Sequence, residues 1–566
     1  MIRGGGWLLV CALLVALPAA SGAEDSAGDA GARRCLGCHA TLHDTRHLIA
    51  DRYRESIHGD LDCLQCHDGA RIAAIDAVHR AATAGATAAA PAIIAALRAK
   101  SRFPDALAAC QGCHPGPFAA VRQGVHGQAL LGDGNADAPF CTDCHQEIHY
   151  LRPVAEVASS VARGHVIETC AACHANRTLA SRARLNAAVV ESYQAHFHGK
   201  KYTLGGAETP TCAVCHGHHA IAPVAAPGGL ATPAVKVALC ARCHDGATPE
   251  FAAAFTHTPV DLEHNPVAAV ARLVLTTLVA VTIALLSLHI ALDLYAEARA
   301  RRRPPRAPHI RAGLSWERYQ RLPRQVERMD LHARIQHGVL LFAIVYLMAS
   351  GLALKFPEQP FAKLWIGLWR GVENAGHLHR FAAVILICVV VYHLLYLAVL
   401  RRRGRLSLSM VPRKADAALL VANLRYLSGR SEQPPYFAKY TYYQKLDYWL
   451  VASVALVMIA TGLMYWFPTA AARLLPAAAA EWIWGVAYTL HSTEAVLVLF
   501  FSFVWHFYNV HLKSRVFPMS WVWLDGKMAL DDLLDEHPAT FDALVQANDG
   551  EGSRADHDAP HGRGPR

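Results

Sequence analysis

The sequence has few charged residues. Asp, Glu, Lys and Arg make up only 17% of its 566 residues, whereas about a quarter is usual for soluble domains. It also lacks any molybdenum, flavin or nucleotide signature. The low charge and the mean hydropathy of +0.19 indicate membrane-embedded segments. Histidine and cysteine are abundant instead, and the 33 His and 16 Cys exclude a generic soluble enzyme.

The N-terminus has the pattern of a secretory signal. A short positive region at Met1 to Arg3 precedes an apolar run from Trp7 to Ala20 and a small-residue site at Ser21 to Ala23. A membrane anchor is the alternative, but the run is short for a hydrocarbon core of about 30 Å. We therefore expect residues 1–23 to be a signal peptide and the mature chain to begin near Glu24, outside the cytoplasm.

Residues 24–265 contain no apolar stretch long enough to cross a bilayer, but five long apolar runs follow. They cover residues 267–296, 335–355, 377–400, 447–467 and 489–512. At about 1.5 Å per residue, each is long enough to span the membrane as a helix. We therefore predict an all-α protein with three parts after the signal peptide. These are a loop-rich domain with short helices over 24–265, a transmembrane bundle of about five spans over 266–515, and a C-terminal segment over 516–566 that is disordered from about 547.

The loops between the apolar runs differ in charge. Loop 297–334 holds 11 Arg and loop 401–446 holds 10 Lys plus Arg, whereas loops 356–376 and 468–488 hold only Lys363, Arg370 and Arg473. The positive-inside rule places the two basic loops and the C-terminal segment in the cytoplasm, and residues 24–265 in the periplasm, of a bacterial inner membrane. Because topology accounts for the net charge of +9, we expect no nucleic-acid partner.

Fourteen of the sixteen cysteines fall in seven copies of C-x-x-C-H, the attachment signature of c-type haem. The two thiols bond to the haem, and the adjacent His ligates the iron. Zinc sites give no reason for a His after every pair, and seven short disulfide loops each followed by His would be a coincidence. We predict seven covalently bound haems on the thiols of Cys35, Cys38, Cys63, Cys66, Cys110, Cys113, Cys141, Cys144, Cys170, Cys173, Cys212, Cys215, Cys240 and Cys243. Their proximal ligands are His39, His67, His114, His145, His174, His216 and His244.

Thirteen further His lie between residues 24 and 265, and seven would complete the coordination of every iron. Some precede a motif in a recurrent His-Gly setting, and others follow a motif at short range. We predict that the distal ligands include His58, His126, His149, His198 and His219. Either His43 or His47 and either His257 or His264 complete the set, with an exposed or structural His as the alternative at each position. At about 35 residues per haem, this domain cannot form an ordinary apolar core, so we expect the stacked haems to form it.

The apolar runs also contain histidines, and ionisable groups in membrane helices are usually functional. His379 and His393 are 14 residues apart, so they share a helix face about 21 Å apart along the axis. His491 and His506 are 15 apart, a slightly poorer alignment, and His337 lies near the cytoplasmic end of the second run. This layout predicts two stacked b-type haems, with interhelical hydrogen bonding as the alternative.

The direction in which each helix crosses the membrane then indicates on which side each histidine lies. The third and fifth runs pass from outside to inside, so His379 and His491 lie on the periplasmic side and pair naturally. His337, His393 and His506 compete for the iron on the cytoplasmic side. The weaker candidates are His289, His377 and His511.

Five segments of the membrane half resemble the di-haem cytochrome b subunits of formate dehydrogenase and nickel hydrogenase, over about residues 330–515. They are Arg334–His337 with Ser350–Leu352, His379–Arg380, Tyr448–Trp449 with Thr461–Gly462, His491, and His506–Tyr508. The resemblance implies that His337 pairs with His506 and that His379 pairs with His491. It leaves His393 without an iron, near the quinone. The fusion of seven c-type haems to such a bundle resembles, in architecture alone, the inner-membrane quinol-oxidising cytochromes of metal-reducing bacteria.

Two haems within the membrane make sense only if electrons cross the bilayer. We therefore predict a quinone site near the cytoplasmic ends of the second, fourth and fifth runs, where Tyr443, Lys445 and Asp447 lie; interfacial anchoring is their alternative role. Quinol from the membrane pool is oxidised there, and electrons pass through both b-type and the c-type haems to a periplasmic cytochrome or reductase. The reverse flow uses the same carriers.

Two other functions stay open. One is an electron-transfer subunit that anchors a separate periplasmic reductase or dehydrogenase complex. The other is a multihaem reductase, which needs an iron with an open position; all seven motifs keep their His.

Overall fold

The structure is a computed structural model that describes residues 36–37, 39–41, 47–66, 104–146, 148–258, 260–302, 314–514 and 516–557. The predicted signal peptide lies outside these residues, as do Cys35, Cys38, His43 and His67. The chain divides into two compact units. The first comprises residues 1–173 with 216–223, and the second comprises residues 174–215 with 224–566.

Short helices carry the C-x-x-C-H motifs. A single helical turn places the two cysteines, three residues apart, on the same side of the helix. Up to residue 265 the helices are α2 (Ala50–Arg54), α3 (Cys63–Cys66), α6 (Pro104–Cys113), α7 (Pro115–Gln123), α8 (Val125–Gly127), η1 (Gln128–Gly132), α9 (Cys141–His145), η2 (Ile148–Tyr150), α10 (Val166–His174), α11 (Arg177–Arg182), α12 (Val189–Ala195), α13 (Phe197–Thr203), α14 (Cys212–His216), α15 (Pro233–Ala241) and α16 (Pro249–Ala252).

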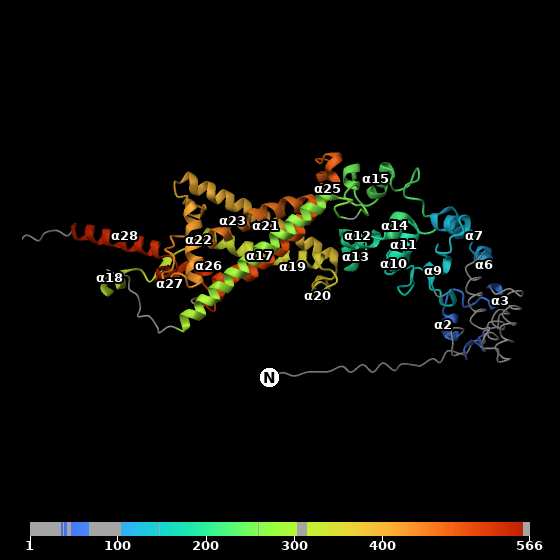
Figure 1. The fold of residues 1–566 in the computed structure, drawn as a ribbon, viewed down its shortest axis with the longest axis horizontal. Helices are drawn as coiled ribbons and strands as arrows, with labels where there is room; N and C mark the ends of the chain where they lie inside the picture. Colours follow the sequence, from blue (N-terminus) through green and yellow to red (C-terminus); the bar gives the residue numbers. More distant parts are fainter. Residues whose placement is uncertain are drawn as a thin grey trace, which may run out of the picture. The chain divides into compact units, whose positions relative to one another are not determined.

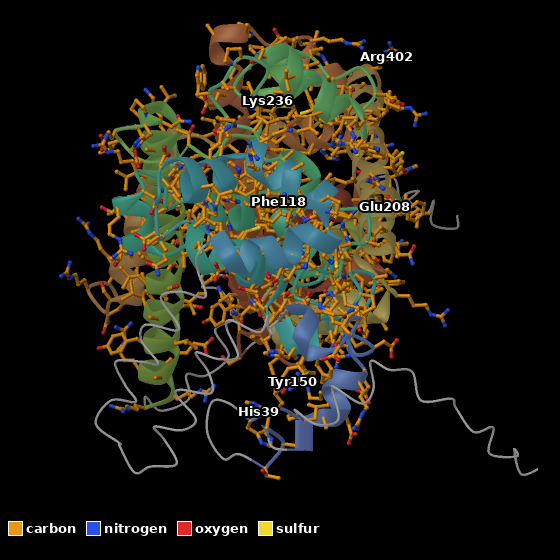
Figure 2. All side chains as sticks on the ribbon, turned by 90° about the vertical axis from the view of Figure 1, so that its right-hand side faces the viewer. His39, Phe118, Tyr150, Glu208, Lys236 and Arg402 are labelled. Atoms are coloured by element: carbon orange, nitrogen blue, oxygen red, sulfur yellow. The ribbon has the colours of Figure 1, made fainter. Side chains whose placement is uncertain are left out.

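Side chains join the segments between these short helices in the first unit. The hydroxyl of Tyr150, which Figure 2 labels, accepts a hydrogen bond from the Ile49 amide at 2.9 Å, and the Arg52 guanidinium lies 4.4 Å from its ring centroid. The backbone amide of Ile57 donates to the Leu151 carbonyl, and that of Val125 donates to the Ile221 carbonyl. Such links join segments that are far apart in the sequence, where few apolar side chains are buried.

Five helices of the second unit are long and apolar enough to cross a membrane, which confirms the prediction of an all-α chain with five spans. They are α17 (Pro266–Arg301), α19 (Leu331–Lys355), α21 (Val372–Arg402), α23 (Tyr442–Trp466) and α25 (Ala480–Phe500), the last continued by the π-helices η5 (Phe501–His506) and η6 (Tyr508–Leu512). Figure 1 shows them side by side; α19 packs along α21, and α17 and α23 pack along α25. Polar caps fix three of their starts: Asn265 for α17, Asp330 for α19 and Thr441 for α23.

Smaller elements surround the ends of the spans. They are α18 (Trp316–Arg321), β1 (Gln325–Glu327), α20 (Pro360–Leu368), η3 (Leu408–Met410), α22 (Lys414–Leu427), α24 (Pro468–Ala472), η4 (Ala477–Ala479), α26 (Val522–Asp525), β2 (Lys527–Ala529), α27 (Leu530–Glu536) and α28 (Pro538–His557). Strands β1 and β2 pair antiparallel, with Val326 opposite Met528. Leu322, Leu530, Leu533 and Phe541 form a small core beside them. Helix α28 extends into the tail for which the sequence predicts disorder.

The four spans after α17 form an internal repeat. The sequence from Ser350 to Pro357 at the end of α19 reads SGLALKFP, and the sequence from Thr461 to Pro468 at the end of α23 reads TGLMYWFP. The two segments are 111 residues apart, and a second long span, α21 or α25, follows each of them. The pair α19–α21 therefore corresponds to the pair α23–α25.

Candidate functional site

His379 on α21 and His491 on α25 are held in the same way, each by a hydroxyl of the preceding span. Ser350 donates its hydroxyl proton to the Tyr346 carbonyl at 2.8 Å, so its oxygen accepts a hydrogen bond from Nδ1 of His379 at 2.7 Å. Thr461 donates to the Val457 carbonyl at 2.7 Å, and its oxygen accepts from Nδ1 of His491 at 2.9 Å. With each hydroxyl proton on the backbone carbonyl, both imidazoles carry their own proton on Nδ1. Both Nε2 atoms are then unprotonated, as a metal ligand requires.

A glycine faces each of these two rings. A Cβ atom built on Gly351 would lie 3.7 Å from Cε1 of His379, and one built on Gly462 would lie 3.3 Å from Cε1 of His491. A larger side chain at either position would crowd the imidazole. The Ser-Gly and Thr-Gly pairs of the repeat thus orient a histidine and leave space beside it.

His337 on α19 faces His506 on η5, with ring centroids 6.3 Å apart. Two ring nitrogens at about 2 Å from one metal ion would place the centroids at about this separation. Nδ1 of His506 donates to the Asp447 carboxylate at 3.2 Å, and the same carboxylate accepts a hydrogen bond from the Trp505 indole at 2.7 Å. Nδ1 of His337 is buried and has no hydrogen-bond partner among the residues that the structure describes.

The π-helix η5 explains why the two histidines of the fifth span are 15 residues apart. His491 and His506 are 15 residues apart, whereas His379 and His393 on the repeated span are 14 apart. A π-helical turn accommodates one extra residue. The insertion therefore allows His506 to face His337, despite a spacing that is poor for a regular α-helix.

His393 belongs to neither pair. Its Nδ1 donates to Oε1 of Gln336 at 2.7 Å, and its Nε2 accepts a hydrogen bond from the Tyr448 hydroxyl at 2.9 Å. The sequence names His393 as a competitor for the second iron, but the structure brings His337 and His506 together instead. Neither Gln336 nor Tyr448 was singled out as a partner from the sequence. An alignment of the α19–α21 pair with the α23–α25 pair could have indicated both.

The residues predicted to line a quinone pocket have other partners. The ammonium of Lys445 is buried and lies 2.8 Å from the Asp416 carboxylate on α22. The Asp447 carboxylate accepts the hydrogen bonds from His506 and Trp505. The Lys513 ammonium lies 4.9 Å from the Tyr443 ring centroid. His289, the weaker candidate on α17, is buried, and its Nε2 lies 2.6 Å from the Tyr442 hydroxyl.

Three of the predicted distal histidines lie opposite the His of a C-x-x-C-H motif. The ring centroids are 6.1 Å apart for His58 and His114, and 6.2 Å for His145 and His219, both in the first unit. In the second unit, His198 and His244 are 6.3 Å apart. Burial, His244 and Lys201 lower the pKa of His198 to about 4, so this imidazole is neutral at neutral pH.

The other predicted ligands lie on short elements. His126 is in α8, His149 is in η2, and His174 and His216 end α10 and α14. His257 lies 2.9 Å from the Ser192 hydroxyl, and the exposed His264 lies 2.9 Å from the Asp261 carboxylate. Half-buried His196, which the sequence did not single out, has its ring 5.1 Å from that of His198.

Consecutive motifs are close together in space. Burial, followed by the neighbouring thiols of Cys110 and Cys113, raises the pKa of Cys66. Burial also raises the pKa of Cys144, with Cys170 as the next cause, and that of Cys215, with Cys240 as the next cause. The Cys110 and Cys141 thiols hydrogen-bond to each other. The second motif therefore adjoins the third, the third adjoins the fourth, and the fourth adjoins the fifth. The sixth motif likewise adjoins the seventh.

Within the second unit, α13 and its flanks contact the ends of the spans. Lys200 donates a hydrogen bond to the Tyr488 hydroxyl, and the Lys201 ammonium lies 3.3 Å from the Glu373 carboxylate. Leu204 packs in a core with residues of α19, α20 and α21. His198 is two residues before Lys200, and His491 is three residues after Tyr488. The 198–244 pair and the 379–491 pair are therefore on elements in direct contact.

Residues 328–518 match the model of the prokaryotic cytochrome b561 family. No curated protein matches the chain. The match covers α19, α21, α23 and α25, which carry all four paired histidines, and leaves α17 outside. It indicates a multi-pass bacterial membrane domain with b-type haem that acts in electron transfer. The paired imidazoles fit b-type haem. Where a hydroxyl or carboxylate accepts a hydrogen bond from Nδ1, Nε2 is left as the nitrogen that can ligate iron.

Proposed function

We propose that this protein carries electrons from the membrane quinone pool to a periplasmic acceptor. Quinol is oxidised at the cytochrome b domain, and the electrons continue along seven c-type haems. The observation that carries this proposal is the recurrence of one geometry. Four histidine pairs have ring centroids between 6.1 and 6.3 Å apart, three at C-x-x-C-H motifs and one within the spans.

Two b-type haems are held in the bundle, one by His379 and His491 and the other by His337 and His506. A bound haem supplies a one-electron carrier whose potential depends on its axial ligands and their hydrogen bonds. Ser350, Thr461 and Asp447 fix the orientation of three of these imidazoles. The chain thereby provides two carriers at different depths of the membrane.

The c-type haems extend this path outside the membrane. The second to fifth motifs adjoin one another in sequence order, and the sixth adjoins the seventh, so the haems within each of these groups would lie close together. The contact between Lys200 and Tyr488 joins the element of the 198–244 pair to the helix of His491. We therefore take the haem of the seventh motif, Cys240 to His244, as the first to receive electrons from the bundle.

The proposed orientation favours outward flow of electrons. The basic loops 297–334 and 401–446 place the 337–506 pair on the cytoplasmic side and the 379–491 pair on the periplasmic side. At a membrane potential of about 150 mV, an electron that crosses outward gains roughly 3.5 kcal/mol. This gain favours reduction of periplasmic acceptors by quinol.

Membrane vesicles of defined orientation test the proposal. Right-side-out vesicles that contain the protein and a quinol analogue should reduce membrane-impermeant ferricyanide added outside. Vesicles without the protein are the control. Reduction from the inverted face alone would contradict the proposed orientation, and no reduction from either face would contradict the proposed function.

A further inference from the structure

One polar cluster of the bundle has no role in holding the two haems. His393 lies on α21 between Gln336 of α19 and Tyr448 of α23, hydrogen-bonded to both. His393 and Tyr448 are half-buried, and Gln336 is only 8% exposed. Because polar groups within membrane helices are costly, such a cluster indicates a function.

The internal repeat relates this cluster to the 337–506 pair. With the 111-residue shift that aligns Ser350 with Thr461, Gln336 aligns with Asp447 and His337 aligns with Tyr448. His393 corresponds to His506 once the extra residue of η5 is counted.

The contacts correspond as well. Nδ1 of His393 donates to Gln336 as Nδ1 of His506 donates to Asp447. The ring centroids of His393 and Tyr448 are 5.7 Å apart, and those of His506 and His337 are 6.3 Å apart. The bundle thus contains a second copy of the haem-ligand arrangement.

Tyr448 changes the chemistry of this copy. Its hydroxyl donates directly to Nε2 of His393, the nitrogen that would otherwise ligate an iron. Because Gln336 accepts a hydrogen bond from Nδ1 of His393, that nitrogen carries the proton and Nε2 is left as a neutral hydrogen-bond acceptor. In addition, Nε2 of Gln336 is a buried donor for which the described part of the chain provides no partner. The copy therefore offers an acceptor, a hydroxyl and an unused amide donor, a set that suits a small molecule with both hydroxyl and carbonyl oxygens.

We propose that His393, Tyr448 and Gln336 form the site that binds the quinol head group; this rests on the proposed function. One quinol hydroxyl replaces Tyr448 as the donor to Nε2 of His393. The Gln336 amide donates to an oxygen of the ring. Oxidation breaks both O–H bonds and releases two protons and two electrons. His393 takes the first proton at Nε2, the second proton passes to water, and the electrons leave one at a time for the adjacent b-type haem as acceptor.

The surroundings of the site suit a ligand that arrives from the bilayer. Leu394 next to His393 is 58% exposed, and Trp449 next to Tyr448 is 46% exposed, on the outer surface of helices long enough to span the membrane. Gln336 adjoins His337 in the sequence, and Tyr448 adjoins Asp447. The bound head group would therefore lie close to the 337–506 pair.

The test compares three variants of the full-length, haem-loaded protein. His393→Leu and Tyr448→Phe remove groups of the site. Tyr392→Phe is the matched control, because it removes a hydroxyl from the neighbouring residue of α21, one that contacts His332 instead. Decylubiquinol and menadiol serve as quinol probes. For each variant, the b-band is followed after addition of quinol and, separately, after addition of dithionite.

We expect His393→Leu to slow quinol-driven reduction at least tenfold and Tyr448→Phe to slow it less. Tyr392→Phe should resemble the wild type, and dithionite should reduce all four proteins equally. Each should also keep two b-type haems. Quinol-driven reduction that survives in His393→Leu, or loss of one b-type haem from it, would overturn the proposal.

A binding measurement separates this proposal from the proposed function. Oxidised decylubiquinone is titrated against the protein's tryptophan fluorescence, and His393→Leu should weaken its binding at least tenfold. If neither quinol reduces the wild type, the proposed function fails, and this titration alone decides the site. Equal affinity of the wild type and His393→Leu overturns the site.

Discussion

Replacing Asp447 with Asn tests how the 337–506 pair is controlled. The Asp447 carboxylate accepts hydrogen bonds from His506 and from the Trp505 indole. A carboxylate on the far nitrogen makes an imidazole a stronger electron donor, which favours the oxidised iron. An amide at this position keeps the hydrogen bond from Trp505 but presents its NH₂ group to His506. An NH₂ group cannot accept a hydrogen bond from Nδ1 of His506. The reduced haem should therefore be favoured in Asp447→Asn.

The size of the effect follows from the bond that is lost. A hydrogen bond to a charged group contributes about 1.5–3 kcal/mol and a neutral one about 1 kcal/mol. A difference of about 1.4 kcal/mol corresponds to about 59 mV for one electron. The difference of about 0.5–2 kcal/mol between the two kinds of bond implies that the midpoint potential of one b-type haem rises by about 20–85 mV.

A potentiometric titration of the b-band measures this shift. The haem of the 379–491 pair is the internal control, because hydroxyls rather than carboxylates hold its ligands. An unchanged pair of potentials, a downward shift, or equal shifts of both haems would refute the assignment of Asp447 to His506.

Three further predictions concern other parts of the chain. Thr461→Val removes the acceptor for Nδ1 of His491 and should weaken retention of one b-type haem by about 1–3 kcal/mol; haem content on dilution measures this, and equal loss from Thr461→Ser would contradict it. Gly462→Leu should abolish that haem, because its Cβ would already lie 3.3 Å from Cε1 of His491; two b-type haems in the pyridine haemochrome spectrum would exclude this. Burial, followed by the positive charge of Arg328, lowers the pKa of His537 to about 4, below its usual 6.5. The unfolded segment then binds the proton more tightly, so stability is full above pH 6.5 and falls by up to about 3 kcal/mol as the pH drops toward 4. Proteolysis of the C-terminal segment should accelerate at pH 5 in the wild type but not in His537→Gln.

Hydrophobic length was sufficient to predict the five spans. Four of the five predicted runs lie within a long helix of the structure, and the run 447–467 extends one residue past the end of α23 at Trp466. The least accurate boundary is the start of the fifth span, predicted at residue 489, whereas the long helix begins at Ala480. The residues in between mix Trp and Ala with Glu481 and Gly485, so composition alone did not reveal that they continue the helix.

Contacts between distant residues were beyond the reach of sequence patterns. Asp447 was expected at a quinone pocket because of its level in the membrane, but its partner is decided by which face of α23 packs against α25. Lys445, two residues earlier, faces Asp416 of α22 instead. The pairing of His58 with His114 likewise depends on the packing of α3 beside α6, which no local spacing encodes.

The most direct measurement adds a quinol analogue to the purified, oxidised protein under anaerobic conditions and records the b- and c-type α-bands with time. The account predicts that the b-band grows first, that the c-band follows, and that a quinone-site inhibitor stops both. A c-band that stays oxidised with quinol, yet is reduced at once by dithionite, would contradict it.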